Sequence, residues 1–235
     1  LRLAMKRLLW KLLPKYQREL LLHPLSVVDR QVVNKTLSGT PKFPGVFDRL
    51  ECIFIHVPKC AGSSVAMSLF GSTPTGHLPL YWYEQQFKER YTDYFKFGFV
   101  RDPLQRALSA YHYLLKDPQP RDRAAYELVS GYSRFDTFVD GWLSAENICK
   151  QIHFVPQHHF LQNSMGQIAV DFIGRQEHLD TDFFALCEQL GVSAQLDHLN
   201  RSPRSAFQSS GLCSTATRKR IREVYARDYE LFSYD

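Results

Sequence analysis

Residues 52–71 read CIFIHVPKCAGSSVAMSLFG, and this stretch decides the fold. The run CIFIHV is short, apolar and rich in β-branched residues, which is typical of a buried strand. PKCAGSS follows at once. SVAMSLF then has helical spacing and ends at Gly71, a residue suited to a helix C-cap. We therefore expect a strand, a tight loop and a helix in immediate succession.

A second unit of the same kind begins at Phe95. Residues 95–100 (FKFGFV) predict a strand, and Asp102–Pro103 starts a helix that continues through LQRALSAYHYLL. Proline suits the first helical turn, where its missing N–H is not needed. The repetition of strand followed by helix is typical of an α/β protein.

The rest of the chain extends this pattern. Residues 168–173 (IAVDFI) predict a third strand, with helices over 180–190 and 216–231. Residues 121–165 indicate helices and loops, in which Phe135, Phe138, Val139 and Trp142 share one face. We expect a single α/β domain with a mainly parallel central sheet flanked by helices.

The loop after the first strand is suited to binding phosphate. The first N–H groups of a helix are unpaired, and its dipole favours an anion there. Gly62 permits close approach of the backbone, Lys59 adds a positive charge, and the hydroxyls of Ser63 and Ser64 add donors. The nucleotide motif GxxxxGK[ST] is absent, because here the lysine precedes the glycine. No strand of the Walker B type is evident either, which disfavours hydrolysis of ATP or GTP with magnesium.

The second unit offers another anion site. Arg101 stands at the carboxyl end of its strand, where ligands bind in open α/β sheets. Ser109 follows two turns into the next helix. A guanidinium can bind two phosphate oxygens while a hydroxyl contacts a third. Two such strand-end sites fit a ligand with two separated phosphates, such as a nucleoside bisphosphate.

These residues resemble a known family. HVPKCAGSS (56–64) resembles the 5′-phosphosulfate loop of carbohydrate sulfotransferases, and FVRDPLQRALSAYHY (99–113) resembles their 3′-phosphate motif. Weaker similarity to the chondroitin 4-O and heparan 2-O and 6-O types continues through VPQHHFL, DFIGRQEHLDTDF, HLNRSPRS and YARDYELFSYD. The resemblance covers residues 52–235. Cys60 stands where many relatives have threonine, which removes one hydroxyl contact.

The resemblance implies a P-loop-like sulfotransferase fold and 3′-phosphoadenosine 5′-phosphosulfate (PAPS) as cofactor, with no metal. An acceptor hydroxyl would attack sulfur in line, adenosine 3′,5′-bisphosphate would leave, and Lys59 would neutralise the charge on the bridging oxygen. The cofactor-binding residues that it implies are Pro58, Lys59, Cys60, Ala61, Gly62, Ser63, Ser64, Arg101, Ser109, Arg201, Ser202 and Arg204.

A histidine is the expected general base, because its pKa lies near neutrality. His77 lies in the post-helix segment where the 2-O and 6-O relatives carry their base, and it is the first candidate. His56 either faces the nucleotide or is a structural strand residue. His153, His158 and His159 lack an evident carboxylate partner, so no metal site is expected. His158 or His159 can instead line the acceptor cleft.

The net charge of +5 is a local feature. Residues 1–30 contain seven basic and two acidic residues, so residues 31–235 carry 22 of each sign and are neutral. Nucleic acid is therefore not an expected partner. We divide the chain into a basic amphipathic N-terminal segment with linker, 1–48, and a sulfotransferase domain, 49–235. The helix predicted over 1–13 either adsorbs to an anionic membrane surface or packs its apolar face on the domain.

The compartment follows from cysteine usage and from the first residues. Five cysteines without a CxxC pair indicate reduced thiols. The first residues lack an unbroken apolar stretch of the secretory kind. We expect a bacterial-type cytoplasmic protein, peripheral at the inner membrane surface. The alternative is the Golgi lumen, if an upstream anchor was removed.

The expected acceptor is a carbohydrate, an anionic polysaccharide or a glycan, whose identity the sequence does not indicate. Two other functions stay open: an ATP-dependent kinase-like P-loop enzyme, and a non-catalytic membrane-surface binding protein with the same fold. The oligomeric state is not indicated.

Overall fold

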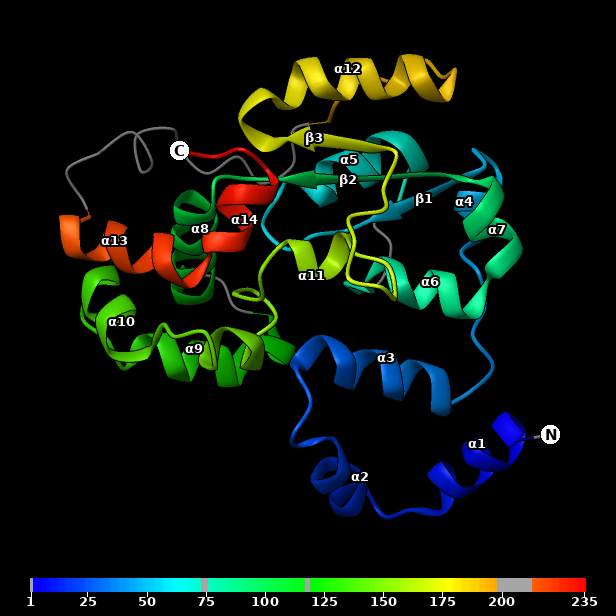
Figure 1. The fold of residues 1–235 in the computed structure, drawn as a ribbon, viewed down its shortest axis with the longest axis horizontal. Coiled ribbons are helices and arrows are strands. Elements are labelled where there is room, and N and C mark those ends of the chain that lie inside the picture. The colour runs from blue at the N-terminus through cyan, green and yellow to red at the C-terminus, as the bar shows by residue number, and fades with distance from the viewer. Residues whose placement is uncertain (1, 73–75, 117–118, 198–212) are drawn as a thin grey trace.

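The computed structural model describes residues 2–72, 76–116, 119–197 and 213–235 (Figure 1). The strands are β1 (Cys52–Ile55), β2 (Phe95–Val100) and β3 (Phe172–Arg175). The α-helices are α1 (Arg2–Leu12), α2 (Lys15–Leu22), α3 (Val27–Leu37), α4 (Gly45–Asp48), α5 (Gly62–Phe70), α6 (Leu80–Gln86), α7 (Lys88–Asp93), α8 (Pro103–Lys116), α9 (Arg123–Ser130), α10 (Phe135–Trp142), α11 (His158–Leu161), α12 (Leu179–Leu190), α13 (Thr215–Val224) and α14 (Ala226–Leu231). Short 3-10 helices are η1 (Pro120–Asp122), η2 (Asn147–Lys150) and η3 (Gln176–His178).

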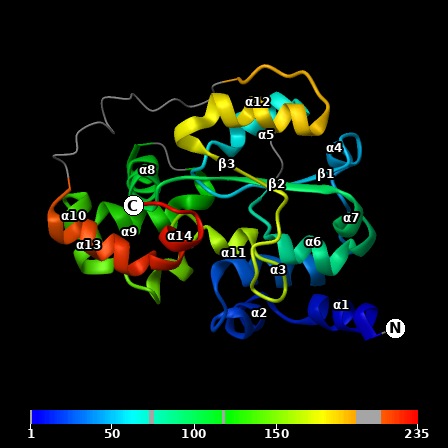
Figure 2. The same cartoon turned by 45° about the horizontal axis from the view of Figure 1, so that its top comes forward.

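Within the described residues, the sheet is parallel, with β2 between β1 and β3. Cys52 pairs with Phe95, and Val100 pairs with Arg175. All four residues of β1 are buried, as a parallel sheet covered on both faces requires. Helices α5 and α12 lie on one face, and α6 and α11 lie on the other (Figures 1 and 2). This arrangement confirms the α/β prediction.

Two apolar cores hold the fold together. The first surrounds the sheet and includes the fully buried rings of Phe54 and Phe97, which stack with centroids 5.1 Å apart. The second lies among α8, α9, α10 and α13 and contains Phe138 and Phe154. The carboxyl end of β2 leads directly into α8, so the site of interest lies where the two cores meet.

Several predicted elements are confirmed. The strand over 95–100 has the predicted bounds, and the loop helix α5 ends at Gly71, whose φ of 67° is the left-handed C-cap expected there. Helices α8 and α12 also match their predicted positions. In α10, Phe135, Phe138 and Val139 are buried together, and Trp142 packs against them.

The third strand does not have its predicted bounds, 168–173. The chain first makes a turn in which Ile168 bridges Gln162 and the Ala169 N–H donates to the Leu161 carbonyl (3.2 Å). Pairing with β2 begins only after the Asp171 N–H donates to the Lys96 carbonyl (2.7 Å), and the strand is Phe172–Arg175. The apolar run is therefore shared between a turn and a strand, a division that hydrophobicity alone does not reveal.

The helix predicted over 216–231 is in fact two helices. Tyr225 interrupts it with φ −107° and ψ 23°, and its buried hydroxyl donates to the Phe154 carbonyl (2.7 Å). A tertiary hydrogen bond therefore causes the break, which places α14 against the segment before α11.

The N-terminal region contains more helix than predicted. A helix was predicted only over 1–13 of the segment 1–48, but α2 and α3 continue to Leu37 and α4 covers Gly45–Asp48. Val28 and Val32 of α3 are buried in the core around the sheet, while the division at residue 48 stays a prediction. No helix among the described residues is long and apolar enough to cross a membrane.

Candidate functional site

The loop between β1 and α5 has an unusual backbone. Lys59 (φ 68°) and Ala61 (φ 60°) both adopt the left-handed conformation, which non-glycine residues adopt at a cost of about 1 kcal/mol or more each. Ala61 is the N-cap of α5, and its carbonyl accepts hydrogen bonds from Ser64 (3.0 Å) and Val65 (3.2 Å). The loop therefore turns sharply into α5, and the first turn of a helix is where unpaired N–H groups can bind an anion.

Gly62 is needed at the start of α5 for a steric reason. A Cβ atom at this position would overlap the imidazole ring of His56. The ring of His56 in turn stacks on Phe54, with centroids 5.8 Å apart. The loop, the last residues of β1 and the first turn of α5 are therefore packed as one unit.

Lys59 is a half-buried cation. Its Nζ lies 3.9 Å from the centroid of the Tyr113 ring, a cation–π contact. Burial lowers the pKa of Lys59 to about 8, and the positive charge of Arg101 acts in the same direction. Removal from water disfavours the charged amine, and an anion placed beside it would restore its charge.

Gln157 joins the loop to the end of β2. Its side chain is fully buried, and its Oε1 accepts hydrogen bonds from the Cys60 thiol (3.2 Å) and from the Arg101 N–H (2.8 Å). Its Nε2 donates to the Arg101 carbonyl (2.8 Å). One amide therefore sets the spacing between the two strand ends. Cys60 directs its side chain inward, so only its main-chain N–H is left to offer a ligand.

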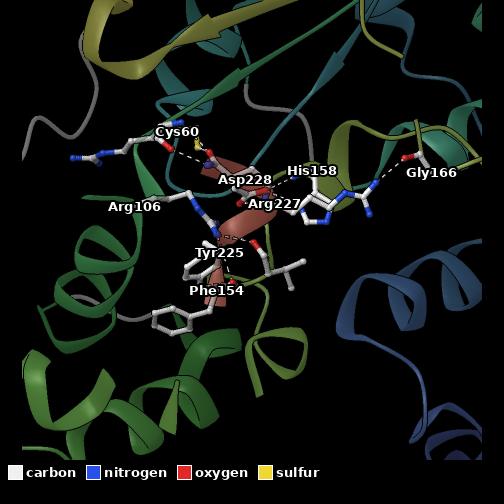
Figure 3. A network of polar contacts seen from close by, with 11 residues as sticks. Cys60, Arg106, Phe154, His158, Gly166, Tyr225, Arg227 and Asp228 are labelled. Atoms are coloured by element: carbon white, nitrogen blue, oxygen red, sulfur yellow. Dashed lines mark hydrogen bonds and ion pairs between the residues drawn. The ribbon is translucent and has the colours of Figure 1, made fainter. Parts of the chain in front are cut away.

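Asp228 of α14 holds Gln157 in place (Figure 3). Its carboxylate accepts hydrogen bonds from the N–H groups of Gln157 (2.7 Å) and His158 (3.0 Å), and from His158 Nδ1 (2.6 Å). Asp228 is fully buried, and a buried carboxylate is tolerated only when its oxygens are satisfied in this way.

Arg106 fixes the same segment from the side of α8 (Figure 3). It is completely buried, and its guanidinium donates to the carbonyls of His153 (3.3 Å) and Val155 (2.7 Å). The side chain carries its charge into the interior because main-chain carbonyls replace water. Helices α8 and α14 therefore both hold residues 153–158 against the loop.

Arg101 and Ser109 lie where the second anion site was predicted. Arg101 directly follows β2, and Ser109 lies on α8 with 9% of its surface exposed. Burial lowers the pKa of Arg101. The next residue, Asp102, donates its N–H to Glu177 (2.8 Å), and Glu177 also accepts from the Tyr234 hydroxyl (3.0 Å). The turn after β2 is thus tied to η3 and to the carboxyl-terminal residues.

His56 and His77 form a pair beside the loop. His77 Nδ1 lies 2.8 Å from the His56 carbonyl, and the two ring centroids are 4.5 Å apart. Burial lowers the pKa of His77 to about 4 and that of His56 to about 3. Both rings are therefore neutral at pH 7.

A further polar group lies on the other side of Lys59. The Tyr113 hydroxyl donates to Asp122 (2.9 Å), and His153 Nε2 lies 3.2 Å from the other carboxylate oxygen. The bond to His153 lowers the pKa of Asp122. Among the residues that the structure describes, the buried Nδ1 of His153 has no hydrogen-bond partner. The group orients the ring on which the Lys59 amine rests.

Comparison with known families matches the model of the Sulfotransferase family to residues 46–235. The chain belongs to the sulfotransferase family. Among curated proteins, it is similar to carbohydrate sulfotransferase 14 of Homo sapiens, with 27% identity over an alignment of 173 residues that covers 64% of this chain and 45% of the relative. The Mus musculus protein of the same name is 25% identical over 170 residues, with the same coverage. The chain thus spans just under half the length of these relatives, and no solved structure matches it significantly.

In this sulfotransferase-family chain, Lys59 and Arg101 are near enough to influence each other's charge, and so are His77, His153 and Asp122. These side chains surround the carboxyl ends of β1 and β2. The resemblance also pointed to Arg201, Ser202 and Arg204, which lie outside the described residues.

The candidate site also contains residues that the sequence did not single out. Gln157, Asp228, Tyr113 and Asp122 hold the loop, and each reaches its partner through the tertiary fold. His153 and His158 do have carboxylate partners, contrary to expectation, in Asp122 and Asp228. Even so, no group of three or more His, Cys, Asp or Glu in the described ranges is placed to hold a metal. The quoted segment VPQHHFL contained Gln157, but nothing in its spacing gave that residue a role.

Proposed function

We propose that this chain transfers a sulfuryl group from PAPS to a hydroxyl of a carbohydrate acceptor. The observation that carries the proposal is the coupling of two cationic strand ends, Lys59 after β1 and Arg101 after β2, through the amide of Gln157. A ligand with phosphates at both ends of a nucleoside fits this arrangement. Membership of the sulfotransferase family supports the same donor.

The residues of the loop fit the phosphosulfate group in three respects. The first N–H groups of α5 offer donors, Gly62 leaves room for the His56 ring that packs on this turn, and Lys59 lies at the loop with its pKa lowered by burial. When bound, PAPS would supply the sulfuryl group. Lys59 would stabilise the charge on the leaving oxygen, and the α5 N–H groups would cradle it.

His77 is the proposed general base. A carbonyl can only accept a hydrogen bond, so the contact with the His56 carbonyl requires the proton of His77 to be on Nδ1. Nε2 then carries the lone pair that can take the proton of the acceptor hydroxyl. The low pKa of His77 keeps this nitrogen unprotonated at neutral pH. An anionic cofactor nearby would raise that pKa and so strengthen the base.

The carbohydrate acceptor rests on the names of the two relatives, both carbohydrate sulfotransferases. Transfer of radiolabelled sulfate from PAPS across a panel of polysaccharides tests it directly. Calorimetric titration with adenosine 3′,5′-bisphosphate and with ATP–magnesium tests the cofactor. Binding of ATP–magnesium alone would contradict the proposal and favour the kinase-like alternative.

Two substitutions test the assigned roles. Lys59→Ala is expected to abolish turnover, with Lys150→Ala as a control because the exposed amine of Lys150 contacts its chain neighbours Glu146 and Asn147. His77→Ala is expected to reduce turnover about a hundredfold or more while leaving cofactor affinity unchanged. The exposed His112 of α8 provides the matched control, His112→Ala. Near wild-type turnover in His77→Ala would remove His77 from the base role.

A further inference from the structure

Helices α1 and α2 expose large apolar side chains on successive turns. Leu8 is 60% exposed, Leu12 is 72% exposed and Leu20 is 72% exposed. We call this set the apolar ridge; it consists of Met5, Leu8, Leu9, Leu12, Tyr16, Leu20 and Leu21, each more than half exposed. Single exposed apolar residues are common, but so many large ones on two consecutive helices are typical of a surface for a partner or a membrane.

The helices that carry the ridge are packed on the protein and are not detached from it. The opposite side of α1 is packed on the protein: Trp10 is only 6% exposed, and Arg7 Nε donates to the Thr36 carbonyl of α3 (2.9 Å). Leu22 at the end of α2 is also only 6% exposed. In both views, α1 and α2 lie on the far side of α3 from the sheet (Figures 1 and 2). Helix α1 is thus apolar on two sides, and only one of them is buried.

Basic side chains accompany the ridge. Lys6, Lys11 and Lys15 are all exposed on the same two helices. The acidic residue of these helices, Glu19, lies 3.7 Å from Lys15. Exposed leucines interleaved with lysines form the pattern of a helix that lies in the interface of an anionic bilayer.

We propose that the apolar ridge docks the protein on an anionic lipid surface, with the leucines among the acyl chains and the lysines among the headgroups. A neutral partner would leave the lysines without counter-charge, and a second copy of the ridge would bring like charges together. An anionic bilayer satisfies both the apolar and the charged side chains. This inference is independent of the sulfuryl transfer, because none of its residues lies in the site.

Vesicle flotation of the full chain tests the proposal, with phosphatidylcholine vesicles compared to vesicles that also contain phosphatidylglycerol. We expect binding to the anionic vesicles only, weakening with salt. The variant Leu8→Glu/Leu12→Glu should bind at least about a hundredfold more weakly, since each of the two buried leucines contributes at least about tenfold. Lys6→Glu/Lys11→Glu/Lys15→Glu should weaken binding about a hundredfold, because each lysine near an anionic surface contributes about fivefold.

The control is Met165→Glu/Phe184→Glu, which changes two apolar residues that are 74% and 65% exposed and lie outside the ridge. It should bind like the wild type, and circular dichroism should show all variants folded. Wild-type protein that ignores anionic vesicles at low salt would overturn the proposal, as would equal binding by Leu8→Glu/Leu12→Glu. A dimer that only this variant disrupts, without vesicle binding, would identify a second copy as the occupant and also overturn it.

Discussion

Substitution of Gln157 by methionine separates the stability of the fold from the geometry of the anion site. Methionine has nearly the same length as glutamine but neither a strong acceptor nor a donor. It removes both side-chain hydrogen bonds to the Arg101 main chain, each 2.8 Å long, and the bond from the Cys60 thiol. Because the Arg101 N–H and carbonyl then lose their partners in a part-buried place, we expect a loss of about 3 kcal/mol of unfolding free energy.

For a chain of this size, that loss corresponds to a decrease in Tm of about 6–12 °C. The more specific effect is on binding. The loop after β1 and the turn after β2 are no longer held at a fixed spacing, so affinity for adenosine 3′,5′-bisphosphate should fall at least tenfold, measured by calorimetry well below the Tm. The control is Val32→Ala in α3, which creates a cavity in the core and costs about 2–3 kcal/mol. It should lower the Tm without changing the affinity. Gln157→Met with reduced stability but wild-type affinity would refute the positioning role of Gln157.

Three further substitutions test other parts of the site. Gly62→Ala should reduce sulfate transfer at least tenfold in a turnover assay. The added Cβ would displace His56, and the His56 carbonyl orients His77. A variant with wild-type turnover would contradict this reasoning. Asp228→Asn should cost about 3 kcal/mol in denaturant unfolding, since it deprives buried donors of a charged acceptor; unchanged stability would show that Asp228 does not hold Gln157 and His158. In the wild type, affinity for adenosine 3′,5′-bisphosphate should fall as the pH rises through about 8, because Lys59 loses its proton there. The variant Lys59→Arg should not show that fall. An identical pH profile in both proteins would exclude Lys59 as the group that titrates.

The sequence predicts the local parts of the site well. β1, β2, α5 and α8 are each specified by residues within one short segment, in which apolar runs, a glycine and a proline act on near neighbours. The third strand was placed wrongly because IAVDFI is apolar throughout, and only tertiary pairing decides which part joins β2. Local patterns therefore predict an element more reliably than they predict its bounds.

The residues that couple the site could not be predicted in the same way. Cys60 meets Gln157 across 97 positions of the chain, and Gln157 meets Asp228 across 71. No periodicity or spacing in the sequence around Gln157 or Asp228 predicts such a contact. Cys60 seemed to lack a hydroxyl for the ligand, but the structure directs its thiol into the interior, where burial raises its pKa to about 12 and keeps it a neutral donor.

The low pKa of Lys59 bears on how residues 31–235, whose net charge is zero, would bind the proposed ligand with two phosphates. Burial makes the charged forms of Lys59 and Arg101 unfavourable. The Tyr113 ring holds the Lys59 amine, and the Gln157 amide holds the main chain of Arg101. A bound anion stabilises the charged forms that burial disfavours in the free protein. Binding therefore depends on the local geometry and not on the overall charge. Because the same anion raises the pKa of Lys59, binding above pH 8 must be accompanied by proton uptake. Calorimetry in buffers of different ionisation enthalpy measures that proton directly, and binding without uptake would show that Lys59 does not contact the ligand.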